Sequence, residues 1–397
     1  MKDSINLAVI GVGCRGTQHI KDCFAYMDDV NLVGVCDVYA DRVKDAADFI
    51  EAKKGKRPEI ETLDYHELLI ADIVDAVLVA TSWETHITIA IDAMRAGKVT
   101  AMEVGCAYSE GDCHRLIRAY EETETPFMFM ENCCYDRRET MLFKMVREGL
   151  FGDIIHCEGG YCHDLREEVA KGKENRHYRL KNYLSHCCEN YPTHEIGPLA
   201  RILNINHGNR MVSLTSVASR PAGIADYAMR KLGKELDIMQ GDVITTVIKC
   251  AKGQTITLTH STSLPRPYSR RLAICGTRGM YNEDGDYVYI DEKDNEAEWE
   301  QKKVWNNAKD YEEKYLDNTW REFEKQKIDG GHGGMDYIMW RDFIDCFKNG
   351  KKMPIDVYDA ATWLSISYLS EASIMQGGAP VYMPDFTNGR WVSDTEI

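Results

Sequence analysis

The feature that most constrains the fold is a glycine-rich turn directly after the first apolar run of the chain. Residues Ile5–Ile10 have the composition of a buried strand, and Gly11, Gly13 and Gly16 then complete the pattern G-x-G-x-x-G before a helical stretch. The first glycine permits the sharp bend, the second lets the main chain approach a pyrophosphate, and the third lets helix and strand pack closely. The alternative is a glycine turn in an unrelated α/β fold.

An acidic residue stands where such a turn needs one. Asp37 ends the second apolar run, 21 residues after Gly16. A carboxylate there accepts hydrogen bonds from adenosine ribose hydroxyls and repels a 2′-phosphate, while the helix N-terminus offers N–H groups to the phosphates. The sequence therefore predicts a dinucleotide site that takes NAD rather than NADP.

Strand-like and helical stretches alternate through the first 130 residues, and the pattern then changes. The apolar runs are Ile5–Ile10, Asn31–Cys36, Asp75–Ala80, Lys98–Met102 and Pro126–Met130. Continuous apolar runs separated by helices predict a parallel sheet buried on both faces, that is, a Rossmann domain over residues 1–130. Longer strands follow at Gly152–His163, Met211–Ala218, Asp242–Cys250 and Gln254–Ser261. These longer strands predict a mostly antiparallel α+β domain over residues 131–397. Within it we expect solvated surface at Asn282–Asp317 and helices at Asp336–Lys348 and Asp359–Gln376.

Two further turns should border the dinucleotide, because ligands of open sheets sit at the carboxyl ends of the strands. One is the run Trp83, Glu84, Thr85 and His86, and the other is Glu103-Val104. A lone histidine at a helix start is more often a cap or packing residue than a catalyst.

Composition excludes several classes of partner. The chain has 48 basic and 64 acidic residues and a formal charge of −16, which disfavours nucleic acid and anionic membrane. No apolar run has the length of a membrane-spanning helix, and no signal peptide is expected. Fourteen cysteines without a CxxC pair indicate free thiols in a reducing compartment, which favours the cytoplasm unless an export signal was removed.

Motifs along most of the chain carry a resemblance to a known family. They are Glu103-Val104-Gly105, Glu131-Asn132-Cys133-Cys134-Tyr135, Glu158-Gly159-Gly160-Tyr161, Tyr178-Arg179-Leu180, Asn190-Tyr191-Pro192-Thr193-His194, Pro265-Arg266-Pro267-Tyr268 and Gly330-Gly331-His332-Gly333-Gly334. With the N-terminal turn, they resemble the glucose–fructose oxidoreductase/inositol dehydrogenase/MocA family, and most of all glycoside hydrolase family 109, the NAD-dependent α-N-acetylgalactosaminidases. Glu103-Val104 replaces the Glu-Lys of the wider family, whose lysine touches the hydroxyl that is oxidised.

The resemblance implies a large open sheet in the second domain, a homo-oligomer, a small glycoside as substrate, and a set of site residues. The NAD-contact positions are Gly11, Gly13, Arg15, Gly16, Asp37, Trp83, Glu84, Thr85, His86, Glu103, Val104, Asn132, Arg179, Tyr191, Pro192, Thr193 and His194. The substrate-contact positions are Tyr161, Arg179, Tyr191 and Tyr268. The implied reaction oxidises the sugar at C3, eliminates the C1 substituent across C1–C2, adds water and reduces C3 again.

That chemistry needs two bases. His194 is the best candidate for the C3 hydroxyl because an imidazole accepts and returns a proton near neutral pH. Tyr191 and Tyr161 are candidates for the C2 proton, and the choice between them stays open. Asn190 stands where the wider family often has aspartate, so support for a charged His194 must come from elsewhere, for which Glu195 is one candidate.

Two rival interpretations remain. One is an NAD-dependent oxidoreductase on a sugar, inositol or glycoside with net NADH formation, against which the missing lysine argues. The other is a sensor that kept the fold without turnover. No metal is expected, because His332 among its glycines lacks further ligands at metal spacing, and we expect that loop to border the sugar pocket.

Overall fold

The computed structural model describes residues 3–394, which form two compact units. The first unit contains Met1–Val104, Glu110–Arg137 and Asn318–Ala361, and the second contains Gly105–Ser109, Arg138–Asp317 and Thr362–Ile397. The chain therefore returns to the first unit late, which the sequence pattern did not anticipate. The division at residue 130 stays a prediction about folding domains, since these units describe packing and not independent folding.

The first unit is built on a six-stranded parallel sheet, and the predicted Rossmann architecture is confirmed. Its strands are β1 (Ile5–Ile10), β2 (Val30–Cys36), β3 (Ile60–Thr62), β4 (Ala76–Val79), β5 (Val99–Glu103) and β6 (Phe127–Met130). They lie in the order β3-β2-β1-β4-β5-β6, so the sheet reverses its winding between β1 and β4. In doubly wound sheets the ligand binds at that reversal, outside the carboxyl ends of the strands.

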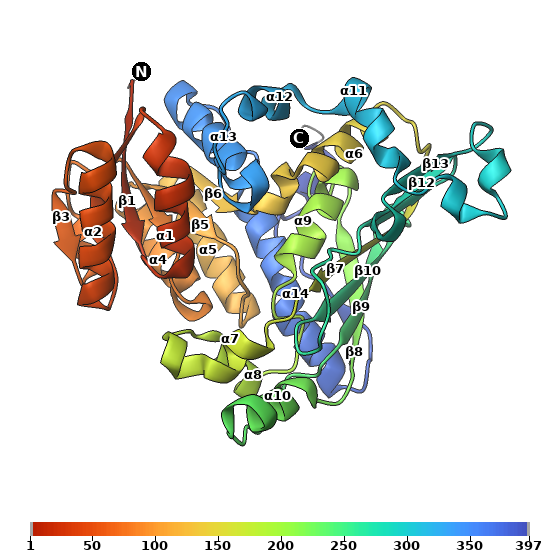
Figure 1. The fold of residues 1–397 in the computed structure, drawn as a ribbon, viewed down its shortest axis with the longest axis horizontal. Helices are drawn as coiled ribbons and strands as arrows, with labels where there is room; N and C mark the ends of the chain where they lie inside the picture. Colours follow the sequence, from red (N-terminus) through yellow and green to blue (C-terminus); the bar gives the residue numbers. More distant parts are fainter. Residues whose placement is uncertain (1–2, 395–397) are drawn as a thin grey trace. The chain divides into compact units, whose positions relative to one another are not determined.

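Helices connect the parallel strands of the first unit (Figure 1). They are α1 (Cys14–Gln18), α2 (Ala40–Lys54), α3 (Tyr65–Leu69), α4 (Trp83–Arg95) and α5 (Glu110–Thr123). The late return adds α12 (Asn318–Glu324) and α13 (Met335–Asn349). Trp340 of α13 is fully buried and packs edge-on against Phe24, with ring centroids 4.6 Å apart. Burial of two such aromatic side chains fixes α13 beside the segment that follows the glycine turn.

The second unit contains an eight-stranded sheet, which is mostly antiparallel as predicted. Its strands are β7 (Ile154–Cys162), β8 (Met211–Ala218), β9 (Ile244–Cys250), β10 (Thr255–Ser261), β11 (Ala273–Gly276), β12 (Gly279–Asn282), β13 (Tyr287–Ile290) and β14 (Val381–Tyr382). The order is β13-β12-β11-β7-β10-β9-β8-β14, and the β7–β10 pair is parallel. The stretch Asn282–Asp317, expected as solvated surface, also contributes β13, and it buries Tyr311 and Tyr315.

One helix precedes β7, and the other helices of this part of the chain lie between the strands of the sheet along the sequence. They are α6 (Arg137–Arg147), α7 (Arg166–Lys171), α8 (Arg179–Ser185), α9 (Thr193–Ile202), α10 (Gly223–Leu232), α11 (Glu312–Tyr315) and α14 (Val357–Met375), of which α6 and α14 cross from one unit to the other. Helix α9 contacts β7, as Figure 1 shows. The loop before α9 and the carboxyl end of β7 therefore lie close together.

The fourteen cysteines are all free, as predicted, and only Cys14, Cys187 and Cys275 are not buried. Burial raises the pKa of the Cys36 thiol to about 12 and that of Cys162 to about 11. Such thiols stay protonated and behave as small apolar side chains. None of the helices in the described part of the chain is long and apolar enough to cross a membrane.

Candidate functional site

The glycine turn has the geometry that its pattern predicts. Gly11 has a φ of +93°, and a Cβ there would lie 2.5 Å from the carbonyl oxygen of Ala80. A Cβ on Gly16 would lie 2.0 Å from the carbonyl oxygen of Gly11. A Cβ on Gly13 would meet only the Arg42 guanidinium, at 3.2 Å. The fold therefore requires glycine at positions 11 and 16, whereas position 13 is left open on a face that a ligand can approach.

Asp37 closes this turn from the end of β2. Its Oδ2 accepts a hydrogen bond from the N–H of Val12 at 3.0 Å, and its Oδ1 accepts one from the N–H of Tyr39 at 3.1 Å. Arg42 lies 3.7 Å from the same carboxylate. The acid is thus held at the glycine turn, with its charge partly balanced by a neighbouring guanidinium.

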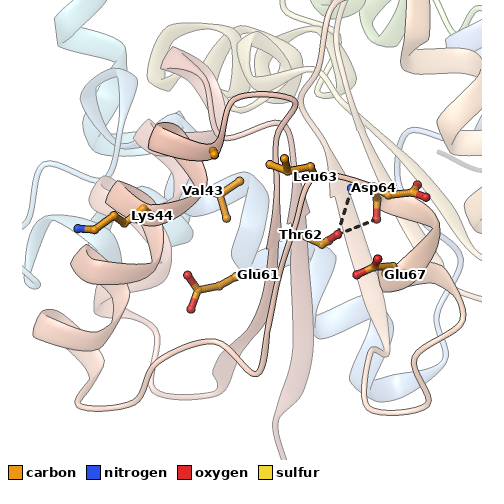
Figure 2. A pocket seen from close by; sticks show the side chains of 8 residues that line it. Val43, Lys44, Glu61, Thr62, Leu63, Asp64 and Glu67 are labelled. Carbon is orange, nitrogen blue, oxygen red and sulfur yellow. Dashed lines mark hydrogen bonds between the residues drawn. The ribbon is translucent and has the colours of Figure 1, made fainter.

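A hollow of about 490 Å³ lies between α2 and the segment that runs from β3 into α3. Figure 2 shows Val43 and Lys44 of α2 on one side and the run from Glu61 to Glu67 on the other. Thr62 and Asp64 are hydrogen-bonded to each other there. The hollow offers apolar walls with a polar, mostly acidic rim, a lining that suits the flat ring of a nucleobase better than a phosphate.

A buried charge cluster, which we call the Arg15 cluster, joins α1, β5 and α13. The Arg15 guanidinium donates to Glu103 Oε1 at 3.0 Å and to both oxygens of Asp336 at 2.6 and 2.9 Å. Asn132 donates to Asp336 at 2.7 Å, and His332 Nδ1 lies 2.8 Å from the same carboxylate. Two-pronged pairing of this kind fixes the orientation of a guanidinium. Arg15, Glu103 and Asn132, all predicted NAD contacts, are therefore brought together here, and His332 lies with them in the first unit.

His19 extends the Arg15 cluster into the core. The Trp340 indole N–H donates to His19 Nδ1 at 2.9 Å, so Nε2 carries the hydrogen and donates to Glu103 at 2.6 Å. Burial lowers the pKa of His19, which therefore stays neutral. Burial alone would raise the pKa of Glu103, but Arg15 and His19 lower it to about 2. Arg15 also holds the pKa of Asp336 well below its usual range against the effect of burial.

The turn after β4 presents two exposed and two buried side chains. Glu84 and Thr85 are exposed, and the Thr85 hydroxyl lies 2.7 Å from that of Thr81. Trp83 and His86 are buried, and His86 Nε2 lies 3.0 Å from the carbonyl oxygen of Thr81. Burial lowers the pKa of His86, so the ring is neutral and ties the start of α4 to the preceding turn. Val104, after β5, is also buried.

The second unit gathers the remaining predicted residues in one aromatic group, which we call the tyrosine group. The ring of Tyr161, at the end of β7, lies 4.8 Å from Tyr191, 5.6 Å from His194 and 6.3 Å from Tyr268, measured between ring centroids. Tyr191 and His194 meet edge-on at 4.8 Å. Tyr161 and Tyr191 are buried, whereas Tyr268 is 46% exposed. His163, which the sequence did not single out, joins the group with its Nδ1 3.3 Å from the Tyr161 hydroxyl.

Arg179 supplies a cation to the tyrosine group. Its guanidinium carbon lies 5.1 Å from the ring centre of Tyr191, and its Nε lies 3.1 Å from Glu168. Burial opposes the charge, but Tyr161, Tyr178 and Glu168 hold the pKa of Arg179 well above its usual range. The guanidinium therefore stays ionised. Tyr178 itself is half-buried, and burial raises its pKa.

The segment from Tyr191 to His194 is positioned by the start of α9. Pro192 occupies the N-cap position, and its carbonyl oxygen accepts hydrogen bonds from the N–H groups of Glu195 at 3.1 Å and Ile196 at 2.9 Å. Thr193 is fully buried in the first turn. A proline fits a helix start because the missing N–H has no partner there in any case. The turn holds His194 against the Tyr191 ring.

The structure places the Glu195 side chain in a different group from the one that the sequence analysis expected. The sequence offered it as support for a charged His194, but it lies in a buried group with Glu189 and His260. Burial, and then repulsion by Glu189, raise the pKa of Glu195 well above its usual range, and burial raises that of Glu189 to about 8. Burial lowers the pKa of His260 to about 4. Asn190 likewise turns away, since its amide donates to Gln240 at 2.6 Å.

Asp336, His19 and Glu189 are the main site-forming residues that the sequence analysis missed. The sequence predicts Asp336 only as part of a helix start, although it stands two residues after a glycine-rich run. No local pattern marks His19 or Glu189, because each acquires its partners from segments far away in the chain.

Two family models match separate parts of the chain. The family model for the NAD-binding Rossmann fold of an oxidoreductase family matches residues 5–130, and that for the C-terminal domain of glycosyl hydrolase 109 matches residues 135–393. A protein from Tannerella forsythia named alpha-N-acetylgalactosaminidase is 36% identical over 98% of this chain and 87% of its own length. One of the same name from Shewanella oneidensis is 36% identical over 98% of this chain and 86% of its own.

Solved structures share the fold at lower identity. A levoglucosan dehydrogenase in complex with NADH and L-sorbose has a TM-score of 0.72 at 18% identity, over 97% of this chain and 100% of that one. The WlbA dehydrogenase from Bordetella pertussis, in complex with NADH and UDP-GlcNAcA, has a TM-score of 0.69 at 16% identity, over 97% and 99% of the two chains. These structures confirm the predicted fold. The two proteins named alpha-N-acetylgalactosaminidase and the two family models identify the family within that fold. The chain belongs to the glycosyl hydrolase 109 family and has an NAD-binding Rossmann fold at its N-terminal end.

Proposed function

We propose that the protein is a glycosidase that retains NAD⁺ and hydrolyses α-N-acetylgalactosaminides or closely related glycosides. The observation that carries this proposal is a match along 98% of the chain to proteins named alpha-N-acetylgalactosaminidase, in a chain with an intact dinucleotide turn. A neutral sugar also suits a protein whose formal charge is −16.

The first unit has the residues to hold NAD⁺. The main chain at Gly11, Gly13 and Gly16 would receive the pyrophosphate, and Asp37 would accept hydrogen bonds from the adenosine ribose. The hollow lined by Val43 and Leu63 would receive the adenine ring. Bound in this way, NAD⁺ supplies a reversible hydride acceptor for a sugar carbon.

The second unit has the residues to move protons. His194 would take the proton of the hydroxyl that is oxidised and return it later. Tyr191 and Tyr161 are both candidates for the C2 proton, because the ionised Arg179 interacts with both and lies 5.1 Å from the ring centre of Tyr191. Tyr161 lies between Tyr191 and His163, where it would orient the sugar and assist the leaving group.

The exposed Tyr268 at the edge of the tyrosine group would contact the sugar face. Asn132, Glu103 and Arg15 would form the floor on the nicotinamide side, since Asp336 anchors both Arg15 and Asn132. Fourteen free thiols support a reducing compartment such as the cytoplasm.

The test is release of p-nitrophenol from p-nitrophenyl α-N-acetylgalactosaminide without added cofactor, with the absorbance of reduced nicotinamide followed in the same cuvette. We expect turnover without accumulation of reduced cofactor. His194→Ala should lower kcat by about 10²- to 10⁴-fold, as loss of a general base does. His114→Ala, an exposed histidine on α5, serves as the matched control and should leave kcat unchanged.

Two results would replace this proposal by its rivals. Accumulation of reduced cofactor in proportion to a free sugar or inositol substrate would make the protein a net oxidoreductase. Tight NAD⁺ binding without turnover on any α- or β-glycoside of a chromogenic panel would make it a sensor.

A further inference from the structure

Three side chains that take no part in the proposed reaction converge inside the second unit. Glu189 lies in the loop before α9, Glu195 in the first turn of α9, and His260 near the end of β10. One ligand atom from each lies within 4.8 Å of the other two, and their side chains are buried. Glu189 and Glu195 flank the segment Tyr191 to His194, so whatever fills this point also fixes that segment.

Among the residues that the structure describes, the carboxylate oxygens of Glu189 and Glu195 and Nδ1 of His260 lack well-formed hydrogen bonds, and a bound cation would satisfy them. Within residues 3–394, none of the four carboxylate oxygens of Glu189 and Glu195 has a well-formed hydrogen bond. The Glu189 carboxyl and the main chain of Tyr161 lie close enough to influence the pKa of Glu195. His260 Nδ1 lies 3.1 Å from Glu189 Oε1, yet it too lacks a properly aligned hydrogen bond. No lysine or arginine of the described chain forms an ion pair with either glutamate. Two buried, ionised carboxylates without a counter-charge are strongly unfavourable, so the pair either takes up protons or holds a cation.

The second ring nitrogen of His260, Nε2, has the kind of hydrogen-bond partner that orients a metal-binding histidine. His260 Nε2 lies 3.2 Å from the Thr262 hydroxyl, which in turn lies 2.5 Å from the Tyr183 hydroxyl. If Nε2 carries the hydrogen and donates it to Thr262, Nδ1 presents its lone pair to the two carboxylates. Histidines that bind metals are oriented by such a hydrogen bond from the other ring nitrogen.

A proton shared between the two carboxyls is the simplest other occupant, but it satisfies fewer atoms. One proton bridges two of the four oxygens and leaves the others, and Nδ1, without a partner. A divalent cation balances two carboxylates and accepts lone pairs from all three residues at once. Ligand atoms about 3.4 Å apart surround a tetrahedral ion with bonds of about 2.1 Å, close to the 3.1 Å between Nδ1 and Oε1.

We propose that Glu189, Glu195 and His260 form a buried site for a divalent transition-metal ion, of which zinc is the expected occupant and manganese the second choice. An imidazole among the ligands disfavours magnesium and calcium, which prefer all-oxygen sites. The ion would tie the loop before α9, the first turn of α9 and β10 together beneath Tyr161, whose ring centroid lies 6.0 Å from that of His260. The role is to position Tyr191 and His194, and the site stands whether or not the proposed glycosidase activity does. No sequence pattern indicates this site, because its ligands follow no local metal spacing.

The test is the metal content of the full-length protein by inductively coupled plasma mass spectrometry. Because the ligands are buried, the ion is expected to enter during folding and to exchange slowly, so two samples are compared. One is purified from zinc-supplemented culture, and the other is unfolded with chelator and refolded with zinc. We expect about one zinc ion per chain in both. Glu195→Gln and His260→Asn should lose it, whereas the matched variants Glu158→Gln and His156→Asn on β7, outside the group, should keep it.

A second readout does not depend on folding of the variants. Wild-type protein refolded with Co²⁺ should show the visible absorption of a cobalt ion with nitrogen and oxygen ligands, and the anomalous peak in its crystals should lie between the three side chains. Zinc far below one equivalent in both wild-type samples, metal retained by both ligand variants, or an anomalous peak elsewhere would each overturn the proposal. In the first case a shared proton occupies the group.

Discussion

Replacing Arg15 by methionine tests the electrostatic account of the Arg15 cluster. A pKa lowered from 4.5 to about 2 means that the folded protein favours ionised Glu103 by about 3 kcal/mol more than an ordinary carboxyl does. Burial opposes this preference, so the guanidinium and His19 together supply more than that net amount. Removing one member of a buried ionic group leaves uncompensated charge and costs about 3–5 kcal/mol. Because the Arg15 side chain is 23% exposed, we expect a loss of about 3 kcal/mol at pH 7.

The loss should depend on pH with a definite sign. The wild-type carboxyls of Glu103 and Asp336 have lowered pKa values, so they contribute stability above their ordinary pKa and lose it as the pH falls toward about 2. Without Arg15, burial raises these pKa values, and folding is penalised more as the pH rises. The difference in free energy of unfolding between wild type and variant should therefore be largest at pH 7 and should fall as the pH drops from about 4.5 toward about 2.

Urea unfolding followed by tryptophan fluorescence measures this difference, and Trp340 reports on the cluster directly because its indole bonds His19. Arg57→Met is the matched control, since Arg57 pairs with Asp48, Glu51 and Glu61 on the surface of the same unit, where ion pairs contribute little. A loss below about 1 kcal/mol for Arg15→Met, or one that stays constant between pH 7 and pH 3, would refute the reasoning.

Further predictions concern the cofactor, the sugar and the assembly. Gly13→Val should fold but lose NAD⁺ binding in calorimetry. Gly16→Ala should lower the thermal midpoint, since its Cβ would lie 2.0 Å from a main-chain oxygen. Equal effects of the two variants on folding would contradict this. Tyr268→Ala should raise KM by up to about tenfold with little change in kcat, because it removes one exposed aromatic contact; a kcat effect alone would argue against a binding role. Val217 and Val247 lie exposed on β8 and β9, and we predict a homo-oligomer through this sheet face that sedimentation equilibrium detects. Aspartate at both positions should dissociate it, and a monomeric wild type would contradict the prediction.

The parts of the fold that could be predicted are those that depend on patterns within short segments of the sequence. Five of the six strands of the Rossmann sheet are continuous apolar runs, and the glycine turn follows the first of them. Strand β3 was missed because Ile60–Thr62 is only 3 residues long. Strands β11, β12 and β13 were missed because each has 4 residues and depends on its neighbours for pairing.

The parts that could not be predicted depend on contacts between distant segments. Arg15 meets Asp336 across 321 positions of the chain, and nothing near either residue shows that α13 returns to the first unit. Glu195 shows the same limit in another form. Because Glu195 follows His194 in the sequence, it was expected to support that imidazole. In the structure, its carboxylate lies instead with Glu189 and His260 of β10. A sequence shows which residues are neighbours along the chain, whereas the packing of α9 decides which way each one points.

The central claim, an oxidation and re-reduction within each hydrolytic turnover, is tested most directly by hydrolysis of p-nitrophenyl α-N-acetylgalactosaminide in deuterated water. The account predicts one deuterium at C2 of the released sugar, because the C2 proton leaves and returns from solvent, together with no accumulation of reduced cofactor. Released sugar without deuterium at C2 would show that the glycosidic bond is cleaved without elimination, and would contradict the account.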